Sequence, residues 1–154
     1  EIMVLGAPVA VQSWRTLLLE AQRRVLERCQ LRATVRTASD PFFVDEYDKK
    51  RLFQLSFDLK YEVQAWMPGT DDTLAIGSVN HHQDYFGVAF NIRPATGEPA
   101  HSACLGFGLD RWCLAVFAQH GLDPDQWPPT LQSILAEHRA LLQSLRGSPW
   151  KLHP

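Results

Sequence analysis

Residues 101–111 (His-Ser-Ala-Cys-Leu-Gly-Phe-Gly-Leu-Asp-Arg) combine residue types that could bind an anion. A strand-like run leads through Gly106 and Gly108 into a helix whose first turn holds Arg111. Glycine has no Cβ, so the backbone could pass close to a flat ligand, and an arginine there would pair well with a nucleotide phosphate. An ordinary strand–glycine–helix corner with Asp110 and Arg111 as a surface pair would show the same letters. Spacing alone does not separate the two interpretations.

Residues 78–87 form a second polar segment (Ser-Val-Asn-His-His-Gln-Asp-Tyr-Phe-Gly). On a strand, Ser78, Asn80 and His82 would share one face while His81 points to the other. Because Asn80 offers both a donor and an acceptor, we expect Ser78 and Asn80 to line a pocket. Adjacent histidines on a strand point in opposite directions and cannot chelate one ion together, so His81 and His82 are interpreted as structural.

The remaining reactive side chains have weaker local signals. The three cysteines, Cys29, Cys104 and Cys113, have no paired spacing, which favours a reducing compartment over a disulfide framework. A free cysteine is usually a small buried hydrophobe, and we assign Cys29 and Cys113 to packing. Glu62, taken by itself, is interpreted as a solvated strand residue.

The elements that would position these residues follow from hydrophobic periodicity. Alternation and turn signals predict strands at 2–5, 31–37, 57–67, 73–83, 88–92 and 101–107. The Pro-Gly-Thr-Asp-Asp turn makes 57–67 and 73–83 an antiparallel pair. Residues 39–50 are expected to form a loop that can include a short helix.

Three helices are expected around these strands. An amphipathic helix of about five turns begins at Pro8, and another follows Pro128-Pro129. The helix from Gly108 to Gly121 is apolar nearly all round, so we expect it to lie buried in the centre of the domain, with Trp112 and Phe117 in the core. Adjoining strands with helices before and after favour an α+β domain on an antiparallel sheet.

Composition limits the class of protein. A chain of 154 residues with 45% hydrophobic content fits one domain, and its apolar runs are too short to span a membrane. The formal net charge of −2 argues against a protein that mainly grips nucleic acid. We therefore expect a soluble, cytoplasmic protein with a small-molecule or protein partner.

Several segments carry a family resemblance. Residues 106–111 (Gly-Phe-Gly-Leu-Asp-Arg) resemble motif 3 of class II aminoacyl-tRNA synthetases, whose terminal arginine contacts ATP. The run 101–121 is similar to the seryl-tRNA-synthetase group, and closer still to the related amino acid:carrier-protein ligases. Residues 78–84 and the Ser-Asp-Pro-Phe-Phe at 39–43 are further shared landmarks. The resemblance implies that residues 1–154 are a single unit, the C-terminal part of a class II catalytic domain.

The resemblance also implies roles for individual residues. Arg111 would contact ATP, beside Gly106 and Gly108, while Ser78 and Asn80 would line the pocket for ATP and the amino acid. Residues 60–69 resemble the family strand that supplies a carboxylate to the site. The register leaves Glu62 or Gln64 in that role, and both lie on one strand face.

A zinc site is implied in the same way. These ligases, and one unusual group of seryl-tRNA synthetases, hold zinc with two cysteines and a glutamate, and the ion receives the amino group of the substrate. Cys104 and Glu1 stand where the second cysteine and the glutamate are expected, and the first cysteine would lie upstream of Glu1. Two thiolates, a carboxylate and one open position suit a catalytic zinc ion.

The implied function is ATP- and Mg²⁺-dependent loading of a small amino acid onto the phosphopantetheine thiol of a carrier protein. A seryl-type tRNA synthetase fragment is one alternative, although no coiled-coil arm or basic platform for tRNA is visible in the sequence. A non-catalytic, synthetase-like binding module is the other. Motif 1, through which class II enzymes form homodimers, and the Arg-x-Glu of motif 2 are not found in these 154 residues.

Overall fold

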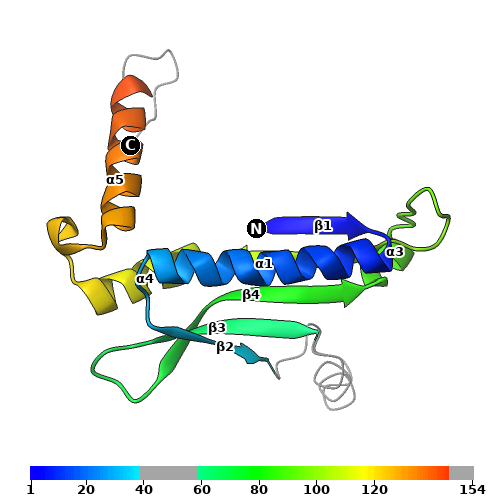
Figure 1. The fold of residues 1–154 in the computed structure, drawn as a ribbon, viewed down its shortest axis with the longest axis horizontal. Helices are drawn as coiled ribbons and strands as arrows, with labels where there is room; N and C mark the ends of the chain where they lie inside the picture. The colour runs from blue at the N-terminus through cyan, green and yellow to red at the C-terminus, as the bar shows by residue number, and fades with distance from the viewer. Residues whose placement is uncertain (39–58, 146–154) are drawn as a thin grey trace.

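The computed structural model (Figure 1) describes residues 1–38 and 59–145. In these residues five strands form one sheet in the order β1-β5-β4-β3-β2. Every neighbouring pair is antiparallel, which confirms the expected type of sheet. The strands are β1 (Ile2–Gly6), β2 (Ala33–Thr37), β3 (Lys60–Trp66), β4 (Thr73–Gln83) and β5 (His101–Phe107).

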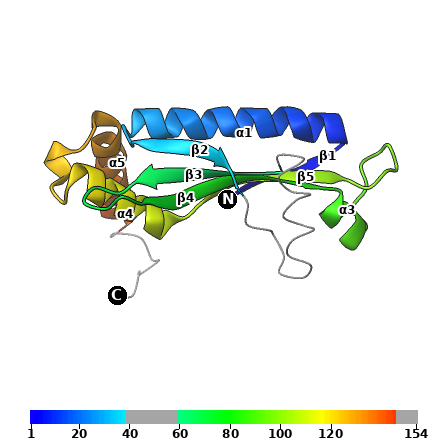
Figure 2. The same cartoon turned by 90° about the horizontal axis from the view of Figure 1, so that it is seen from below.

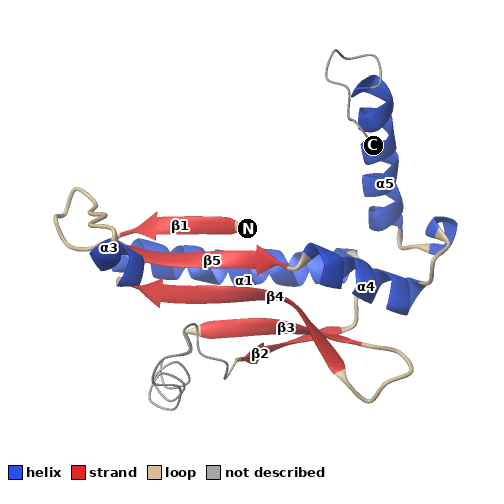
Figure 3. Cartoon of the chain, turned by 180° about the vertical axis from the view of Figure 1, so that it is seen from behind, coloured by secondary structure: helices blue, strands red, loops and turns tan. Residues whose placement is uncertain are grey.

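Among the described residues, the helices leave the middle of one face of this sheet uncovered (Figure 2, Figure 3). Helix α1 lies along one face (Figure 2), while α3 and α4 lie at opposite ends of β5 and α5 projects away beyond α4 (Figure 3). No helix within the described ranges is both long and apolar enough to cross a membrane. The helices are α1 (Pro8–Arg28), α3 (Tyr85–Ala89), α4 (Leu109–His120) and α5 (Pro129–Leu145), with a short 3-10 helix at Pro124–Gln126.

Helix α1 begins where the sequence predicts, with Pro8 in its first turn, a position that needs no backbone N–H donor. Its buried stripe packs on the sheet. Leu18 packs with Val79 of β4 and Leu105 of β5, and Leu26 packs in a second cluster farther along the helix. Burial of this stripe supplies the hydrophobic free energy that fixes the helix on the sheet.

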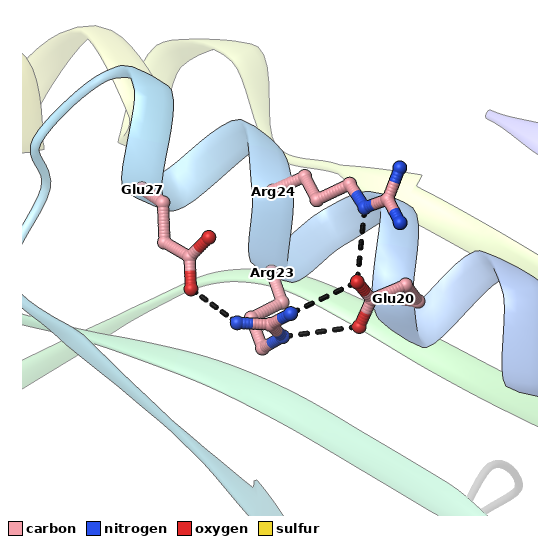
Figure 4. Close-up of polar contacts among 4 residues, drawn as sticks. All are labelled: Glu20, Arg23, Arg24 and Glu27. Carbon is pink, nitrogen blue, oxygen red and sulfur yellow. Dashed lines mark hydrogen bonds and ion pairs between the residues drawn. The ribbon is translucent and has the colours of Figure 1, made fainter.

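The outer face of α1 carries a network of ion pairs (Figure 4). Arg23 donates to both Glu20 and Glu27, and Arg24 donates to Glu20 at 2.9 Å. These contacts hold the pKa of the exposed Glu20 carboxyl down at about 2, chiefly through the hydrogen bond from Arg23. Exposed pairs of this kind contribute little to stability, so the buried stripe and not this network holds the helix.

The side chain of Gln119 joins helix α4 to the edge of the sheet formed by β2 and β3. Gln119 accepts from the Arg32 N–H at 2.7 Å and donates to the carbonyl oxygens of Arg32 and Trp66 at 3.0 and 2.8 Å. These hydrogen bonds satisfy the N–H and C=O groups of Arg32, just before β2, and the C=O group of Trp66 at the end of β3. They join the helix that carries Arg111 to two strands that are distant in sequence.

The predicted strand at 88–92 is wrong. Its first residues belong to α3, where Val88 donates to the Asp84 carbonyl at 2.8 Å and Phe90 to that of Phe86 at 3.0 Å. A Cβ on Gly87 would lie 2.2 Å from the Ala100 carbonyl oxygen, so the glycine lets this turn fold back against the start of β5. This contact is made with a residue far along the chain, and local apolar content did not reveal it. The expected loop at 39–50 lies outside the described residues.

The expectation of a buried α4 is also wrong, although the helix exists and ends at Gly121. Ala115 and Val116 are buried, but Leu109, Leu114 and Phe117 are 76%, 51% and 41% exposed. Because α4 lies at the end of the sheet, neighbours cover only one side of it. Two side chains assigned to packing are therefore exposed, Phe117 and Cys113, whereas Trp112 packs against the core and Cys29 is buried as expected.

Candidate functional site

The sheet face opposite α1 carries the polar side chains of three adjacent strands. Their alternation with buried residues such as Val63 and Val79 sets this arrangement. In the strand register, Glu62 lies opposite Ser78, Ser78 opposite Gly106, and Asn80 opposite Cys104. This open face holds Lys60, Glu62 and Gln64 from β3, Ser78, Asn80 and His82 from β4, and Ser102, Cys104 and Gly106 from β5.

One half of this face is a cavity of about 270 Å³, called here the Arg111 cavity. It brings together five of the residues singled out from the sequence, and Lys60 adds a second cationic side chain to that of Arg111. Pockets with a few convergent polar groups are typical of small-molecule sites. The residues that define it are Lys60, Glu62, Ser78, Gly106, Gly108 and Arg111.

Arg111 lies in the first turn of α4, where its Nη1 donates to the Ala75 carbonyl at 3.1 Å. This bond holds the side chain, which is exposed and lines the cavity, so further donors of its guanidinium can meet an anion. The Gly108 N–H donates to the Ile76 carbonyl at 2.9 Å and sets the corner from which α4 begins. A Cβ on Gly106 would have only Ser78 Oγ within 4 Å, at 3.9 Å, so a side chain there would occupy space in the cavity.

The carboxylate of the Arg111 cavity is held by a neighbour. Lys60 Nζ lies 2.7 Å from Glu62 Oε1, and both side chains are only 16% exposed. Gln64 donates to the other Glu62 oxygen at 3.0 Å and lines an adjacent cavity, so Glu62 rather than Gln64 faces Arg111 across the cavity. Sequence reasoning missed Lys60, although its place two residues before Glu62 puts it on the same strand face.

The other half of the open face, called here the Cys104 cluster, consists of Glu1, Asn80, His82, Ser102 and Cys104. Asn80 Nδ2 lies 3.3 Å from Cys104 Sγ and 3.2 Å from Ser78 Oγ, which links the cluster to the Arg111 cavity. His82 Nδ1 lies 3.0 Å from Ser102 Oγ, and its Nε2 lies 3.7 Å from Cys104 Sγ. The Glu1 side chain hydrogen-bonds with the Cys104 thiol.

The thiol and the imidazole of the cluster carry no charge at neutral pH. Burial, opposed by the hydrogen bond from Asn80 and assisted by Glu1, raises the pKa of the Cys104 thiol to about 11. Burial also lowers the pKa of His82, against the opposing charge of Glu1. At neutral pH the thiol keeps its proton and the imidazole is uncharged, so Cys104 is no nucleophile unless a cation binds beside it.

One polar atom of the cluster lacks a partner. Asn80 Oδ1 is buried and accepts no hydrogen bond from any described residue. An unsatisfied buried acceptor costs free energy, and a donor such as the amino group of a ligand would relieve this cost. The atom therefore marks a place where an N–H group can bind next to the Arg111 cavity.

The metal ligands expected from the sequence are only partly assembled. Glu1 and Cys104 are in contact, but no three Cys, His, Asp or Glu side chains in the described ranges form a ready-made metal centre. A thiol and a carboxylate in contact are nonetheless donors that suit zinc. His82, which is interpreted from the sequence as structural, lies beside Cys104 on the same face, whereas His81 lies on the other face beside His101 with ring centroids 5.8 Å apart.

Two known proteins are similar in sequence to most of this chain. The chain is 31% identical to amino acid–[acyl-carrier-protein] ligase 1 of Bradyrhizobium diazoefficiens, over 98% of this chain and 46% of the ligase. It is 30% identical to the type-2 serine–tRNA ligase of Methanopyrus kandleri, over 84% of this chain and 26% of that enzyme. No family model matches the chain.

A solved structure agrees with these relatives. The crystal structure of Methanopyrus kandleri seryl-tRNA synthetase with tRNA(Sec) from A. aeolicus matches 88% of this chain and 27% of the synthetase, with a TM-score of 0.72 and 30% identity. The resemblance inferred from the motifs and the α+β fold of class II catalytic-domain type are thereby confirmed. The chain spans just under half the length of the ligase and about a quarter of that of the serine–tRNA ligase.

Proposed function

We propose that this chain is the C-terminal part of a class II-type catalytic domain, because its homologues are amino acid–[acyl-carrier-protein] ligases and type-2 seryl-tRNA synthetases. The domain would activate a small amino acid with ATP and transfer it to the phosphopantetheine thiol of a carrier protein. The observation that carries the proposal is the continuity of the open face. The Asn80–Ser78 hydrogen bond joins a site for an anion to a site for an amine.

The proposed chemistry needs positioning more than a protein nucleophile. The carboxylate of the amino acid attacks the α-phosphate of ATP, giving an aminoacyl-adenylate and pyrophosphate. The carrier thiol then takes the aminoacyl group and AMP leaves. Arg111 offsets phosphate charge, and the absence of side chains at Gly106 and Gly108 leaves room for the nucleotide. Magnesium bound with the ATP would share this electrostatic task.

The amine end of the substrate would lie at the Cys104 cluster. Asn80 Oδ1 accepts one N–H of the amino group and Ser78 fixes the amide orientation. Zinc, when bound to Glu1 and Cys104, would offer an open position to a neutral amine. Glu62, held by Lys60, would limit how far an anion can extend into the cavity.

Two observations favour a carrier protein over tRNA as the acceptor of the aminoacyl group. The carrier-protein ligase matches 98% of the chain, whereas the serine–tRNA ligase matches 84%. The formal net charge of −2 also favours a protein acceptor over tRNA, because tRNA binding normally needs a basic face. The whole protein would work in the cytoplasm as a homodimer, as class II enzymes that carry motif 1 do.

The test is ATP–pyrophosphate exchange with each of the twenty amino acids, followed by transfer assays with a holo carrier protein and with tRNA. It uses the longest natural protein that contains these residues, because the carrier-protein ligase is about twice the length of this chain. We expect exchange with small amino acids and transfer to the carrier protein only.

Each other result has a distinct meaning. Exchange followed by transfer only to tRNA would establish the seryl-tRNA synthetase alternative. No exchange with any amino acid, in a protein that is folded and binds ATP, would contradict the proposal and support a binding module. An apo carrier protein without its phosphopantetheine arm is the matched control for the transfer step.

A further inference from the structure

We infer that Lys60 contacts the reacting groups in the adenylate-forming step and offsets negative charge there, an inference that rests on the proposed function. The motifs that carry the family resemblance give this lysine no role. In the proposed step, a carboxylate oxygen of the amino acid bonds to the α-phosphorus of ATP. The bond from that phosphorus to the bridging oxygen breaks, and pyrophosphate leaves with this oxygen. Lys60 keeps its proton throughout, so its part is electrostatic.

The first observation is the position of Lys60 between the two half-sites. Its side chain lines the Arg111 cavity, where the phosphates would bind. Its Cα partner on β4 is Asn80, whose buried Oδ1 marks the proposed amine site. Residues directly opposite each other on antiparallel strands have Cα atoms about 4.5–5.5 Å apart. The reacting carboxylate connects the amine to the α-phosphate, so it must lie in the interval that Lys60 adjoins.

The second observation is a chain of polar contacts that orients the ammonium group. Lys60 Nζ lies 2.7 Å from Glu62 Oε1. The other Glu62 oxygen accepts from Gln64 Nε2 at 3.0 Å, and Gln64 Oε1 accepts from Thr73 Oγ1 at 3.1 Å. Thr73 lies on β4, so the chain crosses between strands and fixes the carboxylate that holds Lys60. A charge oriented in this way needs little reorganisation when the transition state forms.

The third observation is the arrangement of charge around the Arg111 cavity. Lys60 comes from β3 and Arg111 from α4, so an anion in the cavity would meet a cation on each of two elements. The side chains of Lys60 and Glu62 are each only 16% exposed, and partly buried charges are screened less by solvent and salt than exposed ones. Lys60 can therefore act strongly on a group that reacts beside it.

An indirect role for Lys60 predicts a different result. The carboxylate of Glu62 would repel an anionic substrate, and Lys60 could act only by offsetting this charge. In that case, removing both charges together would restore the reaction. If Lys60 contacts the reacting groups, removing both charges leaves the transition state without this cation. The double variant therefore separates the two roles.

The test is ATP–pyrophosphate exchange by the longest natural protein that contains these residues, with Lys60→Met alone and combined with Glu62→Gln. We expect kcat to fall about 100-fold or more in both variants, the loss typical of a preorganised donor. The fall in kcat should exceed any rise in KM for the amino acid, because the contact strengthens as charge develops. Lys60→Arg, which keeps the cation, should retain more exchange than Lys60→Met.

Arg36→Met is the matched control. Arg36 is the Cα partner of Glu62 on β2, but it lines the adjacent cavity and not the Arg111 cavity. It should exchange at the wild-type rate, whereas an equal loss would show that any nearby cation has the same effect and would overturn the specific role of Lys60.

The remaining outcomes separate this inference from the proposed function. Wild-type kcat in the double variant, or in folded Lys60→Met, would overturn the contact with the reacting groups and leave the proposed function standing. The double variant leaves neither charge without its partner, and its melting temperature shows whether it is folded. A wild-type protein without exchange would contradict the proposed function, and the role of Lys60 would be overturned with it.

Discussion

On β4, Val79 and Ser78 are neighbours in sequence but belong to different environments. Val79 is fully buried beneath α1, together with Leu18 and Leu105, whereas Ser78 lines the Arg111 cavity on the open face. The same strand therefore supplies one residue to packing and the next to the candidate site. Packing on the face beneath α1, called here the closed face, fixes the spacing of the strands. This spacing places donors from three strands of the open face within reach of one ligand.

The two faces differ in the surroundings of their buried polar atoms. On the closed face, the buried polar side chains have little room, and a Cβ on Gly77 would lie 2.7 Å from Gln22 Nε2. On the open face, the unpartnered Asn80 Oδ1 lies next to a cavity. A polar atom that a ligand can reach is a candidate for binding, while one sealed under a helix only adds a cost to folding. Changes on the two faces should accordingly affect different measurements.

Removing apolar volume from the closed face should produce the largest loss of stability. Leu105 is 1% exposed, and Leu105→Ala should lower the free energy of unfolding by about 2–5 kcal/mol through lost burial and a residual cavity. Urea denaturation followed by circular dichroism measures this change. The control is Leu122→Ala, the same substitution at a leucine that is 79% exposed, which should change stability by less than about 0.5 kcal/mol. Similar losses for both variants would contradict the division between the faces.

Removing a charge from the open face should affect catalysis without affecting stability. Arg111→Ala should lower the rate of ATP–pyrophosphate exchange by about 100–1,000-fold, the range seen when a preorganised donor to a developing charge is lost. Its melting temperature should stay at the wild-type value because the side chain is exposed. Arg24→Ala, on the outer face of α1 with a side chain 71% exposed, serves as the control and should retain full exchange. Exchange unaffected by Arg111→Ala would remove the phosphate role.

The closed face should also respond to pH through His81. Burial, assisted by the charges of Arg15, His101 and His82, lowers the pKa of His81 from 6.5 to about 4. The unfolded chain then binds the proton more tightly than the folded chain, so this histidine makes stability fall as pH drops from about 6.5 toward 4. Urea midpoints measured across this range should fall less steeply in His81→Gln. An unchanged slope would show that His81 is solvated in solution.

The smallest effect is expected on the outer surface of α1. Glu20→Ala removes the carboxylate shared by Arg23 and Arg24, but the side chains of Glu20, Arg23 and Arg24 are 38%, 55% and 71% exposed, and solvent and salt screen such pairs. The urea midpoint at neutral pH and moderate salt should not change measurably. Because the pKa of Glu20 is lowered to about 2 from 4.5, any contribution is present above pH 4.5 and disappears as pH falls toward 2. A clear loss of stability at neutral pH would mean that the network fixes α1.

Much of the fold could be predicted because its signals are local. Alternation along β4 and β5 correctly separated the face of Ser78 and Asn80 from that of His81. The Pro-Gly turn correctly paired β3 with β4. The failures came where distant parts of the chain decide. The strand expected at 88–92 became α3 because Gly87 packs on Ala100, and α4 is exposed because it lies beyond the end of the sheet.

The features of the candidate site likewise divide into those that local sequence predicts and those that depend on distant parts of the chain. The sequence by itself determined which residue types stand at motif spacing, including Gly106, Gly108 and Arg111, and which of them share a strand face, because both properties are set within a few residues. Only the tertiary structure decided that Lys60 holds Glu62, that Asn80 joins two half-sites, and that His82 lies beside Cys104. These contacts cross between strands, and their register depends on the packing of the closed face, which no single segment encodes.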